Sequence, residues 1–183
     1  MNVIHVASEK GNLKLVKSLI LGGCDKEPKS KYGNTPLIWA SIGGHLEVVK
    51  YLISVGADKE AKDSYKYIPL IIASERGNLE VVKYLISVGA DKETKSKSGW
   101  TSLIFVSEKG HLEVVKYLIS VGADKEAKDD DGYTPLIWAS IGGHLGVVQY
   151  LISVGANKEA KNNYGETALD RAKGKAKDYL KSA

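Results

Sequence analysis

The stretch that decides the fold runs from Gly44 to Lys62 and reads GHLEVVKYLISVGADKEAK. The same segment recurs unchanged from Gly110 to Lys128. Two further copies, 77–95 and 143–161, differ from it only at Asn78 and Thr94 in the first and at Gly146, Gln149 and Asn157 in the second. Self-similarity at a spacing of 33 residues predicts a repeat protein in which each unit packs against its neighbours.

This register divides the chain into units that share one boundary pattern. The units are 1–29, 30–62, 63–95, 96–128, 129–161 and 162–183, and both end units are shortened. Terminal units of a repeat array have one side that faces water, so shortened or altered ends are expected. We expect one domain over 1–183, unfolding as a sum of repeat and interface terms.

Each unit predicts two helices and a turn. In the second unit, Thr35 is a good N-cap before Pro36, whose fixed φ suits a first helical turn. That helix should run to about Ile42, before two glycines. A second helix, with apolar residues at helical spacing, should end at Gly56. The polar segment that follows predicts an extended connection and a tight turn, and neighbouring pairs must stack to form a core.

These motifs resemble the ankyrin repeat over essentially the whole chain. The resemblance is carried by the glycine turn, by T-P-L at Thr35–Leu37 and Thr134–Leu136, by the G-H-L helix and by the closing G-A-D. It implies an all-α fold, a solenoid of stacked antiparallel helix pairs joined by β-turn or hairpin-like loops. The lysine-rich, strongly iterated closing segment is similar to that of the expanded ankyrin families of some protists.

Two departures fall in one turn of the third unit. Lys66 stands where other complete turns have glycine, and a lysine at positive φ costs roughly 1 kcal/mol relative to glycine. Ile68 replaces the capping threonine, a further loss of about 1 kcal/mol. We therefore expect this turn to be the most distorted part of the array.

The charge pattern argues against a nucleic-acid track. The formal net charge is +4, but only Arg76 and Arg171 among the 26 basic residues are arginines. Two lysine rows enclose a glutamate row, and these opposite charges largely cancel at about one Debye length, roughly 8 Å. The rows are Lys59, Lys92, Lys125 and Lys158; Lys62, Lys95, Lys128 and Lys161; and Glu60, Glu93, Glu126 and Glu159. Binding of an anionic partner, a nucleic acid or a membrane surface, through the lysines is kept as an alternative.

No enzyme motif occurs, and we expect no catalytic residue, cofactor or metal. P-loop, GxGxxG, HExxH and GxSxG patterns are missing from the sequence. His45, His111 and His144 occupy one repeat position, so they line up instead of converging, and we expect them to cap and pack the loop between helices. Cys24 takes the place of a repeat alanine and is expected to be small and buried. Asp129–Asp131 is read as a solvated turn.

The positions that vary between units fall into rows at the turn and first helix, whereas the second helix is nearly constant. The resemblance implies that these rows line the concave groove in which partners bind, and Tyr and Trp are enriched at binding hot spots. Packing against neighbouring repeats is the alternative role for such aromatics. The predicted partner-binding residues are Tyr32, Asn34, Trp39, Ile42, Tyr65, Tyr67, Glu75, Arg76, Trp100, Phe105, Glu108, Lys109, Tyr133 and Trp138.

The sequence thus predicts a non-catalytic scaffold for an unidentified protein partner. No apolar run is long enough for a membrane span and no signal peptide is evident, so we expect a monomer in the cytoplasm, with the nucleus also open. Near-perfect repetition leaves open an engineered or duplicated scaffold without a natural partner. The first unit starts within a motif, which is compatible with further repeats or a fused domain upstream.

Overall fold

The computed structural model describes residues 1–183 and contains twelve helices and no strand, which confirms the all-α fold of helix pairs. The chain forms two compact parts, Met1–Asp91 and Lys92–Ala183, which are the first and second units from here on, whereas the 33-residue copies are called repeats. The first contains α1 (Val3–Glu9), α2 (Leu13–Leu21), α3 (Pro36–Gly43), α4 (Leu46–Ser54), α5 (Pro69–Glu75) and α6 (Leu79–Ser87). The second contains α7 (Ser102–Lys109), α8 (Leu112–Ser120), α9 (Pro135–Gly142), α10 (Leu145–Ser153), α11 (Ala168–Arg171) and α12 (Gly174–Ser182). A single cooperative domain over the whole chain stays a prediction.

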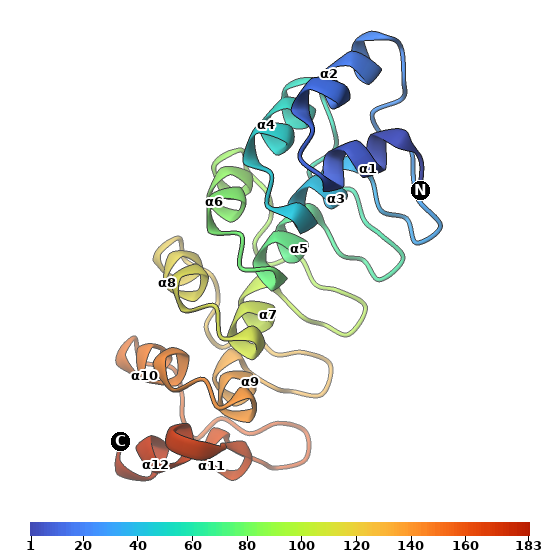
Figure 1. The fold of residues 1–183 in the computed structure, drawn as a ribbon. Coiled ribbons are helices and arrows are strands. Elements are labelled where there is room, and N and C mark those ends of the chain that lie inside the picture. The colour runs from blue at the N-terminus through green and yellow to red at the C-terminus, as the bar shows by residue number, and fades with distance from the viewer. The chain divides into compact units, whose positions relative to one another are not determined.

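Within each unit, consecutive helix pairs stack on one another, and a long turn projects beside each first helix (Figure 1). The first helix of a pair packs on the next first helix, as α1 does on α3 and α7 on α9. The second helices form a separate layer, in which α4 lies between α2 and α6. The turns and first helices therefore share one side of each unit.

The first helices begin and end where the sequence indicates. The Thr35 side chain accepts a hydrogen bond from the Ile38 N–H at 3.3 Å, and Pro36 follows at the first helical position. α3 ends at Gly44, whose φ of 71° places it in the left-handed region that glycine adopts without strain. Thr134 and Gly143 bound α9 in the same way.

The core is formed by residues that every repeat supplies from equivalent positions. In the second repeat Leu37, Ile38, Val49 and Leu52 are fully buried. Ile71, Ile104 and Ile137, at the same position as Ile38, are also at most 1% exposed. Burial of such a side chain stabilises the fold by about 1.5–3 kcal/mol, so this isoleucine position contributes to the core in each repeat.

The turn of the third repeat keeps the geometry of its neighbours, so the expected distortion was wrong. Lys66 does adopt a positive φ, 62°, the single non-glycine residue to do so. The turn still closes through the Asp63 N–H to Tyr67 O bond at 3.1 Å and the Lys66 N–H to Asp63 O bond at 3.1 Å. Ile68 makes no capping bond but is fully buried, and the apolar burial offsets the lost cap.

Adjacent repeats are joined by a row of glutamates that accept backbone hydrogen bonds. In the first unit, Glu27 Oε1 accepts from the Asp58 N–H at 2.8 Å, and Glu60 Oε1 accepts from the Asp91 N–H at 3.0 Å. In the second unit the same bond joins Glu93 to Asp124 and Glu126 to Asn157. The glutamate row that separates the lysine rows therefore has a structural role, because it satisfies a backbone donor of the next repeat.

The repeat histidines also join neighbours instead of capping their own helices. His45 Nε2 donates to the Glu9 carbonyl at 2.8 Å, and His144 Nε2 donates to the Glu108 carbonyl at 2.8 Å. A carbonyl oxygen only accepts, so Nε2 carries the proton in both. Neither histidine makes a side-chain capping bond, which corrects the expected capping role and retains the packing role.

Candidate partner-binding surface

Each turn is held by a polar side chain at its first position, a row that the sequence analysis did not select. Asp129 Oδ1 accepts from the Tyr133 N–H at 2.8 Å and from the Asp131 N–H at 3.1 Å. The equivalent residues in the other repeats make the same kind of bond: Ser30, Asp63, Ser96 and Asn162. Ser, Asp or Asn followed by glycine three residues later is a known turn signature, and Lys66 obscures it only once. Asp129 is 7% exposed, so the expectation of a fully solvated acidic turn is corrected for this residue.

The second unit brings four of the predicted residues into one aromatic cluster. The Trp100 ring centroid lies 4.7 Å from that of Phe105 and 4.5 Å from that of Trp138. Tyr133 lies 5.0 Å from Trp138 and 6.3 Å from Tyr164. Tilted rings at these distances attract one another, by about 0.5–1.5 kcal/mol per pair beyond their burial. The rings of the aromatic cluster therefore support one another.

The clustered residues differ in how much surface they offer. Trp100, Tyr133 and Trp138 are half-buried, less exposed than turn positions suggest. Phe105 is only 6% exposed and its ring packs against that of Trp100, so it offers little surface in the free chain, and its contact with a partner stays a prediction. Tyr164, which was not selected, is 67% exposed at the end of the cluster. Its only sequence signal was its place in a variable turn row.

The first unit holds the remaining predicted residues in a looser arrangement. Tyr65 and Tyr67 lie 5.9 Å apart, and Tyr32 has the Lys31 ammonium 5.8 Å from its ring centre. The Trp39 Nε1 atom is buried and lacks a hydrogen-bond partner. Asn34, Ile42 and Glu75 are half-buried, and Arg76 is exposed.

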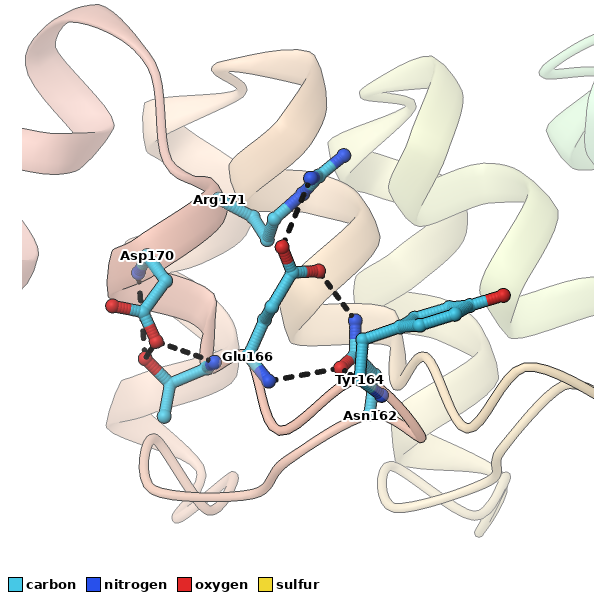
Figure 2. A network of polar contacts seen from close by, with 6 residues as sticks. Asn162, Tyr164, Glu166, Asp170 and Arg171 are labelled. Atoms are coloured by element: carbon cyan, nitrogen blue, oxygen red, sulfur yellow. Dashed lines mark hydrogen bonds and ion pairs between the residues drawn. The ribbon is translucent and has the colours of Figure 1, made fainter.

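Charged side chains flank the aromatic cluster. Glu108 pairs with its neighbour Lys109 at 2.9 Å, and both lie at the end of α7. Figure 2 shows Glu166 between Asn162, which donates to it at 2.9 Å, and Arg171, which pairs with it at 3.2 Å. Exposed ion pairs of this kind contribute little to stability, about 0–1 kcal/mol, and they remain available to a partner.

Two tyrosines of this surface are held in their protonated form. Burial raises the pKa of Tyr67, with smaller contributions from the carboxylates of Glu75 and Asp63. The hydrogen bond that Tyr164 donates to Asp131 raises the pKa of Tyr164, and the charge of that aspartate acts in the same direction. A tyrosine with an ordinary pKa of about 10 is already protonated at neutral pH, so both hydroxyls can donate hydrogen bonds there and the raised pKa values reinforce this state.

The N-terminal end of the first unit carries a separate apolar surface. A cavity of about 490 Å³ is lined by residues that include Val3, Val6 and Leu15. Leu15 is 37% exposed, whereas Val48 at the equivalent position of the next repeat is 1% exposed. Cys24 is also exposed, which corrects its expected burial, whereas Ala57 at the equivalent position of the next repeat is 7% exposed.

No group of three or more His, Cys, Asp or Glu side chains is placed to hold a metal ion. No helix combines the length and apolar character that a membrane crossing needs. A family model described as ankyrin repeats in three copies matches residues 4–96 and 103–181. A search of curated protein sequences returned no match.

Proposed function

Because this chain belongs to the ankyrin repeat family, we propose that it is a non-catalytic scaffold that binds a protein partner on the turns and first helices, the concave groove of the family. Ankyrin repeats generally mediate protein–protein interactions. The contact residues in this proposal are Tyr67, Trp100, Tyr133, Trp138 and Trp39, with Glu75, Arg76, Glu108 and Lys109 at the rim.

The aromatic cluster of the second unit is the observation that carries this proposal. Trp100, Tyr133 and Trp138 are partly exposed, and they belong to rows that vary while the second helices stay constant. Positions that only stack repeats are uniform in a uniform array, whereas positions that contact a partner are free to differ. Half-buried tryptophan and tyrosine with a charged rim is the usual composition of a binding hot spot.

The contacts of the lysine rows favour the aromatic surface over an anionic partner. Lys95 Nζ donates to the Lys128 carbonyl at 2.9 Å, and Lys128 Nζ donates to the Lys161 carbonyl at 3.1 Å. These ammonium groups are thus partly engaged within the protein, and glutamates lie between the rows. A phosphate track needs free cations along one line.

The test is capture of a partner by the full chain at low and high salt. The variant Tyr67→Ala, Trp100→Ala, Tyr133→Ala removes the rings, and the matched control Tyr51→Ala, Tyr84→Ala, Tyr117→Ala removes three tyrosines from the constant second helices. Circular dichroism must show equal helicity. We expect a protein, identified by mass spectrometry, that the wild type and the control retain and the first variant loses. Equal retention by all three, with loss at high salt, would transfer binding to the lysine rows.

A monomeric state and an intracellular site of action are parts of the same proposal. Sedimentation velocity of the full chain tests the first, and fluorescence microscopy of the tagged chain in its native cell tests the second.

A further inference from the structure

The last turn carries an exposed tyrosine bonded to an aspartate that has no cationic partner. Tyr164 Oη donates to Asp131 Oδ1 at 3.2 Å. No lysine, arginine or histidine nitrogen lies within 4 Å of the Asp131 carboxylate, in contrast to Glu166, which pairs with Arg171. Figure 2 shows the Tyr164 ring extending away from the polar network of Asn162, Glu166 and Arg171. Tyr164 is 67% exposed and Asp131 is also exposed, so both side chains are accessible from solvent.

The same turn position in the second repeat already holds a cation. Tyr32 corresponds to Tyr164 in the repeat register, and Lys31 places its ammonium over the Tyr32 ring at 5.8 Å. In the last turn Asn163 stands at the position of Lys31, and its side chain donates to the Asp130 carbonyl instead. The turn geometry thus accommodates an ammonium over a tyrosine, and the last turn supplies none of its own.

The electrostatics of the last turn favour a positive ligand. A cation over the face of tyrosine is attracted by the ring, by about 0.5–1 kcal/mol at an exposed site. Asp131 adds a full negative charge at the ring edge, and Asp130 beside it is also exposed and without an ion pair. An anionic group placed here would meet repulsion from both carboxylates.

From this geometry we propose that Tyr164 and Asp131 form a subsite for the guanidinium or ammonium group of an Arg or Lys side chain on the protein partner. This inference rests on the proposed function and names the chemistry of one contact within it. One exposed ring and one exposed carboxylate hold a free cation only weakly, so the cation is carried by a chain that also contacts the neighbouring Tyr133 and Trp138. Those two rings connect the subsite to the aromatic cluster, since Tyr133 lies 6.3 Å from Tyr164.

The direct test is a nuclear magnetic resonance titration of the full chain with a defined probe. The probe is the peptide acetyl-Gly-Arg-Gly-Arg-Gly-amide, and its control replaces each arginine by citrulline, which keeps the shape and removes the charge. We expect the arginine peptide to shift the backbone amides of Tyr164 and Asp131 and the indole N–H of Trp138. The backbone amides of Tyr51 and Tyr84, in the constant second helices α4 and α6, serve as an internal reference. Equal shifts with the citrulline peptide, or none with either, would overturn the proposal.

Variants separate the subsite from a general effect of charge. Asp131→Asn keeps an oxygen acceptor for Tyr164 and removes the charge, whereas Tyr164→Leu removes the ring. Each variant should weaken binding of the arginine peptide about five-fold. Tyr84→Leu, in the constant second helix α6, should change the affinity by less than two-fold. Asn163→Lys should place an ammonium of the chain itself in the subsite and so weaken binding of the arginine peptide. Ser64→Lys, which adds the same charge at the equivalent position in the first unit, should not weaken this binding. Equal weakening by Asn163→Lys and Ser64→Lys would refute a local site.

The two proposals fail in distinguishable ways. A partner that the aromatic triple variant loses but Tyr164→Leu and Asn163→Lys retain would leave the scaffold function intact and overturn the cation subsite. A partner that the triple variant retains would contradict the scaffold surface, whatever the peptide titration gives.

Discussion

The unpartnered indole of Trp39 makes a stabilising substitution predictable. Trp138, at the same position three repeats later, donates its Nε1–H to Asp129 Oδ2 at 2.9 Å. Ser30 stands where Asp129 stands, nine residues before its tryptophan, and its hydroxyl does not reach the Trp39 Nε1 atom, which is buried without a partner. The substitution Ser30→Asp gives this position the same side chain that accepts the indole hydrogen bond in the later repeat.

The expected gain in stability follows from one hydrogen bond that forms, to the Trp39 indole, and one that is kept, from the Asn34 N–H. Ser30 Oγ accepts from the Asn34 N–H at 3.1 Å, and Asp129 Oδ1 makes the corresponding bond to Tyr133, so the turn loses nothing. Leaving a buried donor unsatisfied costs about 1–3 kcal/mol, and partial desolvation of the new carboxylate offsets some of the gain. We expect a net increase of about 1 kcal/mol in the free energy of unfolding, which raises the melting temperature of a chain of this size by about 2–4 °C.

The assay is urea and thermal unfolding of the full chain, followed by circular dichroism, with the indole N–H of Trp39 observed by nuclear magnetic resonance. Slower exchange of that proton with solvent should accompany the gain in stability. The matched reverse variant, Asp129→Ser, should lower the free energy of unfolding by about 1–2 kcal/mol. If Ser30→Asp leaves stability unchanged while Asp129→Ser lowers it, the equivalence of the two repeats is wrong. If neither variant changes stability, the indole hydrogen bond makes no net contribution to the free energy of unfolding.

Three further predictions test single features of the turns and joints. Lys66→Gly should stabilise the protein by about 1 kcal/mol, since φ is 62° at this position, and an unchanged urea midpoint would refute strain there. His144→Ala removes the donor to the Glu108 carbonyl and should lower the free energy of unfolding by about 1–3 kcal/mol; thermal melts check this, and a neutral result would mean that water replaces the bond. The backbone N–H and hydroxyl of Thr167 lower the pKa of Asp170, so this group contributes stability that is present above its ordinary pKa of about 4 and is lost as the pH falls through the lower folded value. Carboxyl carbon-13 titration should show this low pKa, and Thr167→Val should return it toward the ordinary value.

The repeat architecture could be predicted from sequence because its signals recur in every copy. Glycine at the end of the first helix, threonine at its start and apolar residues at helical spacing each appear several times, and the family match and the twelve helices bear them out. The positive φ of Lys66 was also predictable, since three other complete turns have glycine there. Its consequence was not, because the burial of Ile68, which offsets the lost cap, depends on tertiary packing and not on the turn itself.

The repeat positions that form the candidate site were predictable from the sequence, but the contacts between their side chains were not. Equal sequence spacing places Trp39 and Trp138 at one repeat position, yet their indoles differ because residues nine positions earlier differ. Likewise Phe105 and Trp39 share a row, but Phe105 is covered. Side-chain partners from other rows decide hydrogen bonding and exposure, and such partners are not visible in a single row. Tyr164 was overlooked because its special feature is the aspartate of the previous turn.

The glutamate bonds that join adjacent repeats have a consequence for how such a gene can change. Every complete copy carries both the accepting carboxylate and the donating N–H, as Glu60 with Asp91 and Glu126 with Asn157 illustrate. Recombination between two copies that deletes or adds 33 residues in frame therefore creates a junction in which donor and acceptor still meet. Such an array can gain or lose whole repeats while the bond between neighbours is kept, and point changes in the turns can then alter the surface that each copy presents.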